Sequence, residues 1–258
     1  MKKLLVLLSI FMPMAVLAST FTAKVEDTKA FKSVNVKKLN ADGDFDFMTT
    51  SVISPDGNFS YSEDVKKAEV YTLEFVTANG QNPVHQLVLL PNENVNIVYG
   101  IMYNVLAMKR VDGSANMTLI QQYQNEYHKL SEKAIEIEKR FNETEDKTKQ
   151  FAIQQEFYAL MNATQAKVKS LLNANQELLA AALIAHSEYS NSAVEAKNGI
   201  LKTIYDKQKT LYPDNFIVKE IGKLVENSID VGKVAPEIYL PGVDGKKIRL
   251  ASLRGKVV

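Results

Sequence analysis

Cysteine is absent from the sequence, and so is tryptophan. Without a thiol, the chain as it stands forms no disulfide, holds no metal through thiolates and performs no thiol-disulfide exchange. An excess of either charge is also missing, since 31 Lys and Arg residues accompany 30 Asp and Glu residues. A formal net charge of +1 gives no electrostatic reason to expect nucleic acid or an anionic membrane as a partner.

The N-terminus has the pattern of a secretory signal peptide. Lys2 and Lys3 precede an apolar stretch over residues 4–17, and small residues before the bond after Ala18 suit a signal peptidase. A transmembrane helix needs about 20 apolar residues, and polar residues begin at Ser19. We therefore expect a signal peptide over residues 1–18, a periplasmic location, and no stable membrane insertion after cleavage.

Strand patterns dominate the first part of the mature chain, from about Phe31 to Val111. Apolar residues alternate with polar ones around Phe45–Phe47 and again over Val70–Val76, and turn-forming residues occupy Ser54–Asn58. Short strands separated by turns are typical of an antiparallel β-sandwich or small barrel. We predict such a domain over residues 19–112.

A helical period replaces the strand pattern after Asp112-Gly113. Apolar residues at spacings of three and four predict a helix over about 119–141, a polar break at 142–146, and a second helix from Lys147. A kink or break is expected at Asn173–Asn175. The whole segment, residues 113–229, is predicted to be helical.

Two further helices are predicted near the end of this segment. Ser192 and Glu195 have the spacing of a capping box that opens a third helix, which Pro213 ends. Asp214 is expected to cap a fourth helix. With the sandwich before it, the chain is predicted to be an α+β protein.

The last part of the chain returns to strand patterns at Val231. Glu237–Leu240 and Lys247–Leu250 flank Asp244-Gly245, a dipeptide favoured in hairpin turns. These 28 residues resemble the entry to the thioredoxin-like domain of TlpA/ResA-type thiol-disulfide oxidoreductases and the related AhpC/TSA peroxiredoxins. The resemblance is carried by Gly232, Ala235, Pro236, Leu240, Asp244, Gly245, Lys246, Leu250, Leu253, Arg254, Gly255 and Lys256.

Three other parts of the chain are similar to the same envelope proteins, which often carry an N-terminal β-domain of unassigned function followed by helices. The similarity to the β-domain and its junction is looser and covers Asp56–Ser60, Leu87–Ile97 and Asp112–Asn116, and Tyr212–Asn215 resembles the helical linker. In these families a Trp-Cys-x-x-Cys motif follows the strand that Lys256–Val258 would begin. Here that motif is missing.

The resemblance therefore implies the N-terminal portion of an exported thiol-disulfide oxidoreductase, with residues 230–258 as the truncated start of its thioredoxin-like domain. The intact protein would reduce or exchange disulfides in envelope proteins, which would be its partners. A peroxiredoxin-like peroxidase is the next alternative within this group. An interpretation from another class is a non-catalytic envelope module that binds a ligand or partner.

No residue of the sequence is predicted to be catalytic, cofactor-binding or metal-binding, and no cofactor is expected. His85, His128 and His186 lie in separate segments, so each is expected to be a surface or half-buried residue. Asp42–Asp46 lacks the Gly and Glu positions of a calcium loop and is interpreted as a polar turn before a strand. Ser252 is expected to be a local turn residue. Aromatic residues at helical spacing predict core packing or an interface with a partner helix, and they are Tyr123, Tyr127, Phe141, Phe151, Phe157 and Tyr158.

Overall fold

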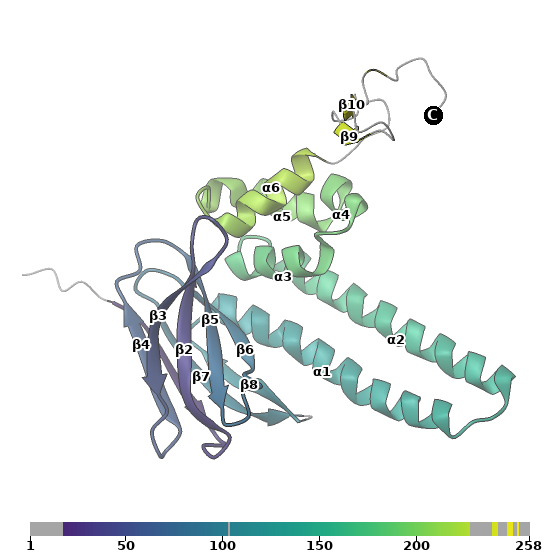
Figure 1. The fold of residues 1–258 in the computed structure, drawn as a ribbon, viewed down its shortest axis with the longest axis horizontal. Helices are drawn as coiled ribbons and strands as arrows, with labels where there is room; N and C mark the ends of the chain where they lie inside the picture. Colours follow the sequence, from purple (N-terminus) through teal and green to yellow (C-terminus); the bar gives the residue numbers. More distant parts are fainter. Residues whose placement is uncertain (1–17, 103, 228–238, 242–246, 250–251, 253–258) are drawn as a thin grey trace, which may run out of the picture.

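The computed structural model describes residues 18–102, 104–227, 239–241, 247–249 and 252. Within these residues the chain forms two four-stranded sheets, then six helices, then a short two-stranded pairing. The α+β class predicted from the sequence is confirmed. Figure 1 shows the two sheets face to face at one end of the molecule, with the helices beside them.

One sheet has the strand order β4-β1-β7-β8, and the other has the order β3-β2-β5-β6. The strands of the first sheet are β1 (Ser19–Val25), β4 (Asn58–Glu63), β7 (Asn94–Met102) and β8 (Val105–Asp112). The strands of the second sheet are β2 (Phe31–Leu39), β3 (Phe45–Val52), β5 (Glu69–Thr77) and β6 (Val84–Leu89).

The sandwich encloses a core of aromatic side chains, because alternate residues of each strand face inward. On β5 the inward-facing residues Tyr71, Leu73 and Phe75 are fully buried. The ring of Phe75 makes edge-to-face contacts with Phe59 and Tyr99 from the opposite sheet. Aromatic contacts therefore join the two sheets at the centre of the domain.

The first strand differs from the sequence prediction, which placed the earliest strand near Phe31. β1 occupies Ser19–Val25 and alternates buried and less buried residues, with Phe21 fully buried. It pairs antiparallel with β4 and parallel with β7. The expectation of purely antiparallel sheets was wrong at this one pairing, because β1 enters the centre of its sheet instead of joining its sequence neighbour β2.

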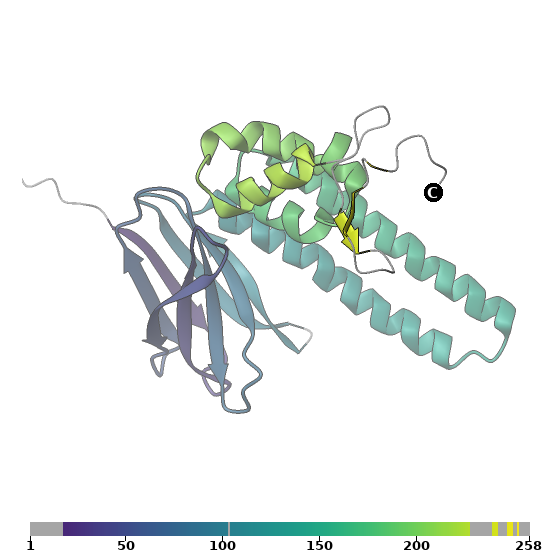
Figure 2. The same ribbon diagram turned by 45° about the horizontal axis from the view of Figure 1, so that its top comes forward.

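The six helices follow β8 directly, starting after the N-cap Ser114. Two helices of 28 residues form an antiparallel hairpin whose far end points away from the sandwich (Figure 1), and four shorter ones cluster against its near end (Figure 2). Their bounds are α1 (Ala115–Asn142), α2 (Lys147–Ala174), α3 (Leu179–Tyr189), α4 (Ala193–Asn198), α5 (Ile200–Leu211) and α6 (Phe216–Glu226). The predicted breaks near 142–146 and 173–175 are both present.

The predicted third helix is split in two at Gly199. Ser192 caps α4 by accepting a hydrogen bond from the amide of Glu195, as the capping box predicts. The Glu195 carboxylate instead accepts the amide of Ile200, at 2.8 Å, and so caps α5. The fourth predicted helix is α6, and its N-cap is Asn215, one residue after the expected Asp214.

Asp42–Asp46 forms the turn that the sequence predicts. The Asn40 side-chain oxygen accepts hydrogen bonds from the amides of Asp42 and Asp44, both at 3.0 Å, and β3 begins at Phe45. These bonds from backbone amides to the Asn40 side chain hold the turn in place.

β9 (Tyr239–Pro241) pairs antiparallel with β10 (Lys247–Arg249), on either side of the predicted Asp244-Gly245 turn. The turn itself, residues 1–17 of the predicted signal peptide (residues 1–18), and most of the segment predicted as a thioredoxin-like start lie outside the described residues. Among the helices that the structure describes, none has the length and apolar character needed to span a bilayer.

Candidate functional site

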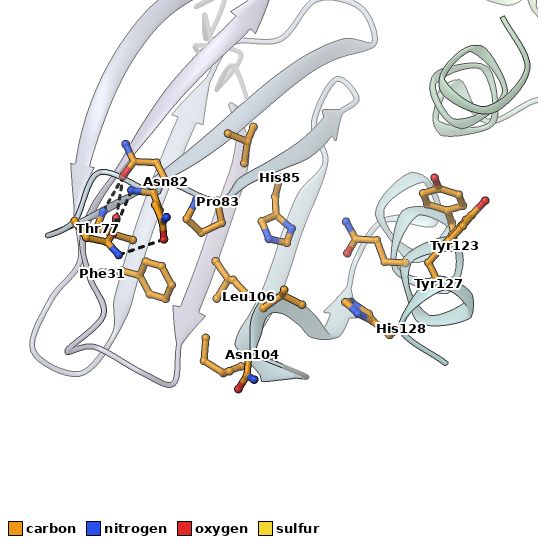
Figure 3. A pocket seen from close by; sticks show the side chains of 16 residues that line it. Phe31, Thr77, Asn82, Pro83, His85, Asn104, Leu106, Tyr123, Tyr127 and His128 are labelled. Carbon is orange, nitrogen blue, oxygen red and sulfur yellow. Dashed lines mark hydrogen bonds between the residues drawn. The ribbon is translucent and has the colours of Figure 1, made fainter. Parts of the chain in front are cut away.

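A cavity opens where the two sheets face each other without a connecting hydrogen-bond ladder. β6 ends one sheet and β8 ends the other, and α1 runs past both of these edges. Between them lies a cavity of about 700 Å³, shown from close by in Figure 3. Its walls come from the ends of β5 and β6, the β7–β8 hairpin and the middle of α1.

His85 on β6 forms the inner wall of this cavity. Its side chain is held at right angles to Phe75 and Tyr99, with ring centroids 5.7 Å and 5.1 Å away, and only 6% of the residue is exposed. Burial lowers the His85 pKa to about 4, a backbone hydrogen bond with Leu106 acts against that shift, and His128 adds to it. His85 is therefore neutral at pH 7, and its Nδ1 atom is buried without a hydrogen-bond partner in the described part of the chain.

Gln124 on α1 brings a second unpaired polar atom to the cavity. Its Oε1 atom is buried and has no partner among the described residues. Gln121, one turn earlier, differs because its Nε2 atom donates to the Met108 carbonyl at 3.0 Å and ties α1 to β8. Since buried polar groups in folded proteins are nearly always hydrogen-bonded, these two atoms at one cavity are available to a water or to a bound molecule.

The part of α1 that lines the cavity is bound to α3 by hydrogen bonds. Tyr123 and Tyr127 both line the cavity, and both phenols donate to the Glu188 carboxylate on α3, at 2.7 Å for Tyr127. Burial first, and then Glu188, raises the pKa of each phenol, so both hydroxyls keep their protons at neutral pH. Figure 3 shows the Tyr123 and Tyr127 rings extending from α1 away from the strands, so Glu188 fixes α1 against α3 on the side opposite the sandwich.

The opposite wall is a loop rich in amides between β5 and β6. Asn82 accepts the Thr77 amide at 2.9 Å, and Asn79 accepts the Thr77 hydroxyl at 2.7 Å and the Gln81 amide at 3.1 Å. The Asn82 amide nitrogen in turn donates to the Glu74 carboxylate at 3.2 Å, so these bonds close the loop on itself and tie it to β5 (Figure 3).

None of the sixteen described residues that line the cavity is Asp, Glu, Lys or Arg. In the sequence as a whole, 24% of residues are charged, so the lining contains fewer charged residues than the chain on average. The pKa of His128 is lowered by burial as well, which leaves both histidines of the lining uncharged at neutral pH. The cavity therefore suits an uncharged ligand that combines apolar surface with hydrogen-bonding groups.

The structure changes the sequence interpretation of the histidines. His85 is buried, where a surface or half-buried residue was expected, because it sits on an inward position of β6. It shares the cavity with His128, and His186 lies elsewhere on α3. Within the described residues no group of three His, Asp or Glu side chains is placed to hold a metal. Ser252 donates to the Arg249 carbonyl at 2.6 Å, as expected of a local turn residue.

Sequence reasoning did not find this cavity, because its residues come from strands and a helix far apart in the chain. The unusual signals, a histidine in an inward strand position and two glutamines three residues apart on one helix, have no local meaning. These residues form a site only because the fold brings the edges of β6 and β8 together with α1.

Comparisons with known proteins identify no family for the chain. No family model and no curated protein sequence matches it. Sea bream transthyretin in complex with thyroxine is similar in structure at a TM-score of 0.29 and 18% identity, over 37% of this chain and 96% of that one. (S)-allantoin synthase is similar at a TM-score of 0.30 and 13% identity, over 38% of this chain and 45% of that one. Scores this low support no conclusion about fold or ligand.

Proposed function

We propose that residues 19–226 form a non-catalytic binding module of the cell envelope that takes an uncharged ligand into the cavity beside His85. The observation that carries this proposal is the pair of buried unpartnered atoms, His85 Nδ1 and Gln124 Oε1, at a cavity without formal charge. Leaving a polar atom buried and unpaired costs stability in the free protein, and a bound ligand removes that cost.

Gln121 and Gln124 of α1 provide a matched test of this idea. Gln124→Met removes an unpaired polar atom and is expected to raise the free energy of unfolding by about 1 kcal/mol, whereas Gln121→Met breaks a bond to β8 and is expected to lower it by about 1 kcal/mol. Chemical denaturation of the full chain measures both. A Gln124→Met variant that is less stable than the wild type would contradict the proposal.

Binding itself can be measured with a defined uncharged probe. Ligand-observed NMR on the full chain is expected to detect N-acetyltyrosinamide and to show binding about tenfold weaker for N-acetyltyrosine, whose carboxylate enters a charge-free cavity. Ile101→Trp, at the partly exposed rim, is expected to block both. Equal binding of the two probes, or binding that survives Ile101→Trp, would show that the cavity is not the site.

We also propose that the module belongs to an exported protein of the TlpA-like thiol-redox group. Support comes from the ordered motif residues between Gly232 and Lys256, and from the β9–β10 pairing on either side of Asp244-Gly245. Export is supported by the signal pattern and by the position of β1, which begins at Ser19, the residue after the expected cleavage.

Two observations test this second proposal. N-terminal sequencing of the protein from a periplasmic fraction is expected to begin at Ser19. Reading the coding DNA past the Val258 codon is expected to give a Trp-Cys-x-x-Cys motif, and a Pro-x-x-x-Thr-x-x-Cys motif would instead indicate a peroxiredoxin. An immediate stop codon would count against both the oxidoreductase and the peroxiredoxin interpretations.

A further inference from the structure

The free edge of β6 carries backbone groups that no strand pairs. The amide of Phe75 on β5 donates to the Pro83 carbonyl at 2.9 Å, so Pro83 and every second residue after it face β5. The N–H and C=O groups of Val84, Gln86 and Val88 therefore point the other way, toward α1 and the cavity.

Helix α1 covers this edge only near Val88, toward the C-terminal end of β6. The Val88 amide donates to the Met117 sulfur at 3.2 Å, which confirms the direction in which these groups point and closes the edge there. Within the described residues, the outward N–H and C=O groups of Val84 and Gln86 have no partner. Val84 is 58% exposed and lines the cavity.

The edge of β8 on the other side of the cavity has the same arrangement. The Met108 carbonyl faces outward to Gln121, so Leu106, two residues earlier, also directs its backbone groups outward. Leu106 lines the cavity beside His85. The opening between the sheets is thus bounded by two strand edges. On β6 the outward groups of Val84 and Gln86 are unpaired at the two-residue spacing of a β-strand, whereas on β8 the Leu106 backbone is hydrogen-bonded to His85.

We propose that this edge binds an extended peptide segment of a partner protein, which adds to β6 as a further strand and places an uncharged side chain in the cavity. Backbone donors and acceptors on every second residue of β6 match those of an extended peptide, which can bond to several of these residues at once. A compact small molecule reaches the backbone groups of only one of them. The charge-free lining, the buried Nδ1 of His85 and the partly exposed Val84 and Ile101 favour a peptide whose inward side chain is apolar or a neutral hydrogen-bond donor. The inference rests on the proposed binding function and names its ligand.

Hydrogen exchange gives the most direct test. The probe is a blocked peptide of seven residues, with threonine and valine alternating about a central tyrosine, added to the full chain. The amides of Val84 and Gln86 are expected to exchange quickly without the peptide and at least about tenfold more slowly with it. The amides of His85 and Leu87 already face β5 and are expected to change little. Uniform protection, or none, would overturn the proposal.

Methylation of the peptide backbone tests the same geometry from the ligand side. Two versions of the peptide carry N-methyl groups on alternate residues, one set on the odd positions and one on the even positions. Only one set faces β6, so one version is expected to bind at least about tenfold more weakly and the other to bind within about threefold of the parent. Equal binding of both would show that the peptide does not add as a strand.

Two variants at one position provide the protein-side control. Val84→Pro removes an outward N–H that pairs with nothing, on an edge strand where proline is tolerated. It is expected to weaken peptide binding at least about tenfold, whereas Val84→Thr keeps the N–H and is expected to bind as the wild type does. If Val84→Pro unfolds, the hydrogen-exchange comparison on the wild type decides alone.

The outcomes separate the inference from the function on which it rests. Binding of N-acetyltyrosinamide without alternating amide protection would retain the cavity as a site and overturn the peptide proposal. Protection of Val84 and Gln86 that rises with protein concentration in the absence of peptide would identify a second copy of the chain as the occupant, and would also overturn it.

Discussion

Gly43, in the turn between β2 and β3, lies directly against the ring of Phe216 at the start of α6. A methyl group added at Gly43 would overlap that ring, with Cε2 only 2.8 Å from the new carbon. The backbone at Gly43 also has φ +97°, a conformation that residues with a Cβ rarely adopt. This contact is one of the places where the sandwich meets the short helices.

Gly43→Ala is predicted to destabilise the protein by about 2–4 kcal/mol, from left-handed backbone strain plus displacement of the Phe216 ring. Gly80→Ala provides the control, because Gly80 has φ +76° and open space around it, and it is expected to cost about 1–2 kcal/mol. Thermal and urea denaturation of both variants measure the difference. Equal losses would show that the packing against Phe216 contributes nothing.

Asn116 is predicted to stabilise a helix other than its own. Its buried side-chain oxygen accepts the Ala180 amide at 2.9 Å, and the N-cap residue of α3, Leu178, makes no side-chain capping bond. Asn116→Leu leaves that amide without a partner and is expected to cost about 1–3 kcal/mol. Asn116→Asp keeps an oxygen acceptor and should recover part of the loss in the same denaturation experiment. A fully stable Asn116→Leu variant would refute the capping role.

Glu188 is predicted to stabilise the α1–α3 contact through its two phenol donors. Glu188→Ala leaves the hydroxyls of Tyr123 and Tyr127 without their acceptor and is expected to lower the free energy of unfolding by about 1–3 kcal/mol. The comparison is Glu220→Ala, which removes a surface ion pair with Lys223 and should cost less than about 0.5 kcal/mol. Similar losses for the two variants would mean that the phenol pair is not a structural unit.

Glu74, on the outer face of the second sheet, is predicted to make the stability of the protein depend on pH. Hydrogen bonds from Lys37 first, and then from Asn82 and Asn35, lower the Glu74 pKa to about 2. A carboxyl whose pKa is lower in the folded state stabilises the fold above its ordinary pKa of 4.5, and this contribution disappears as the pH falls through about 2.

Glu74→Gln is therefore expected to be less stable than the wild type by about 1 kcal/mol at pH 7, with the difference shrinking as the pH approaches 2. Urea denaturation between pH 7 and pH 2.5 follows it, and Lys37→Met should remove part of the same pH dependence. A difference that stays constant across this range would exclude Glu74 as the source.

The sequence predicts most elements of the fold because their signals are local. Alternation over Val70–Val76 marks β5, and Ser192 caps a helix where its spacing from Glu195 predicts. β1 was missed although Phe21, Ala23 and Val25 alternate, because the stretch directly follows the signal pattern and is short. Its parallel pairing with β7 depends on partners about 70 residues away, which no local pattern encodes.

The candidate site was beyond sequence reasoning for the same physical reason. His85 and His128 were set aside because they lie in separate segments, and the fold brings both to one cavity. Burial gives His85 its lowered pKa, and burial is a property of the assembled sandwich. Gln121 and Gln124 look alike in the sequence and differ only in whether β8 lies within reach.

The central position of β1 bears on the timing of assembly during synthesis. β1 is made first among the described strands, yet its sheet neighbours are β4 and β7, and Thr22 pairs with Asn96. Until residue 102 has left the ribosome, Phe21 and Val25 lack β7, one of the two strands that flank β1. Strand pairings between distant residues form slowly and leave apolar segments exposed in the meantime. The apolar residues of β1 therefore lack one flanking strand until β7 has been made.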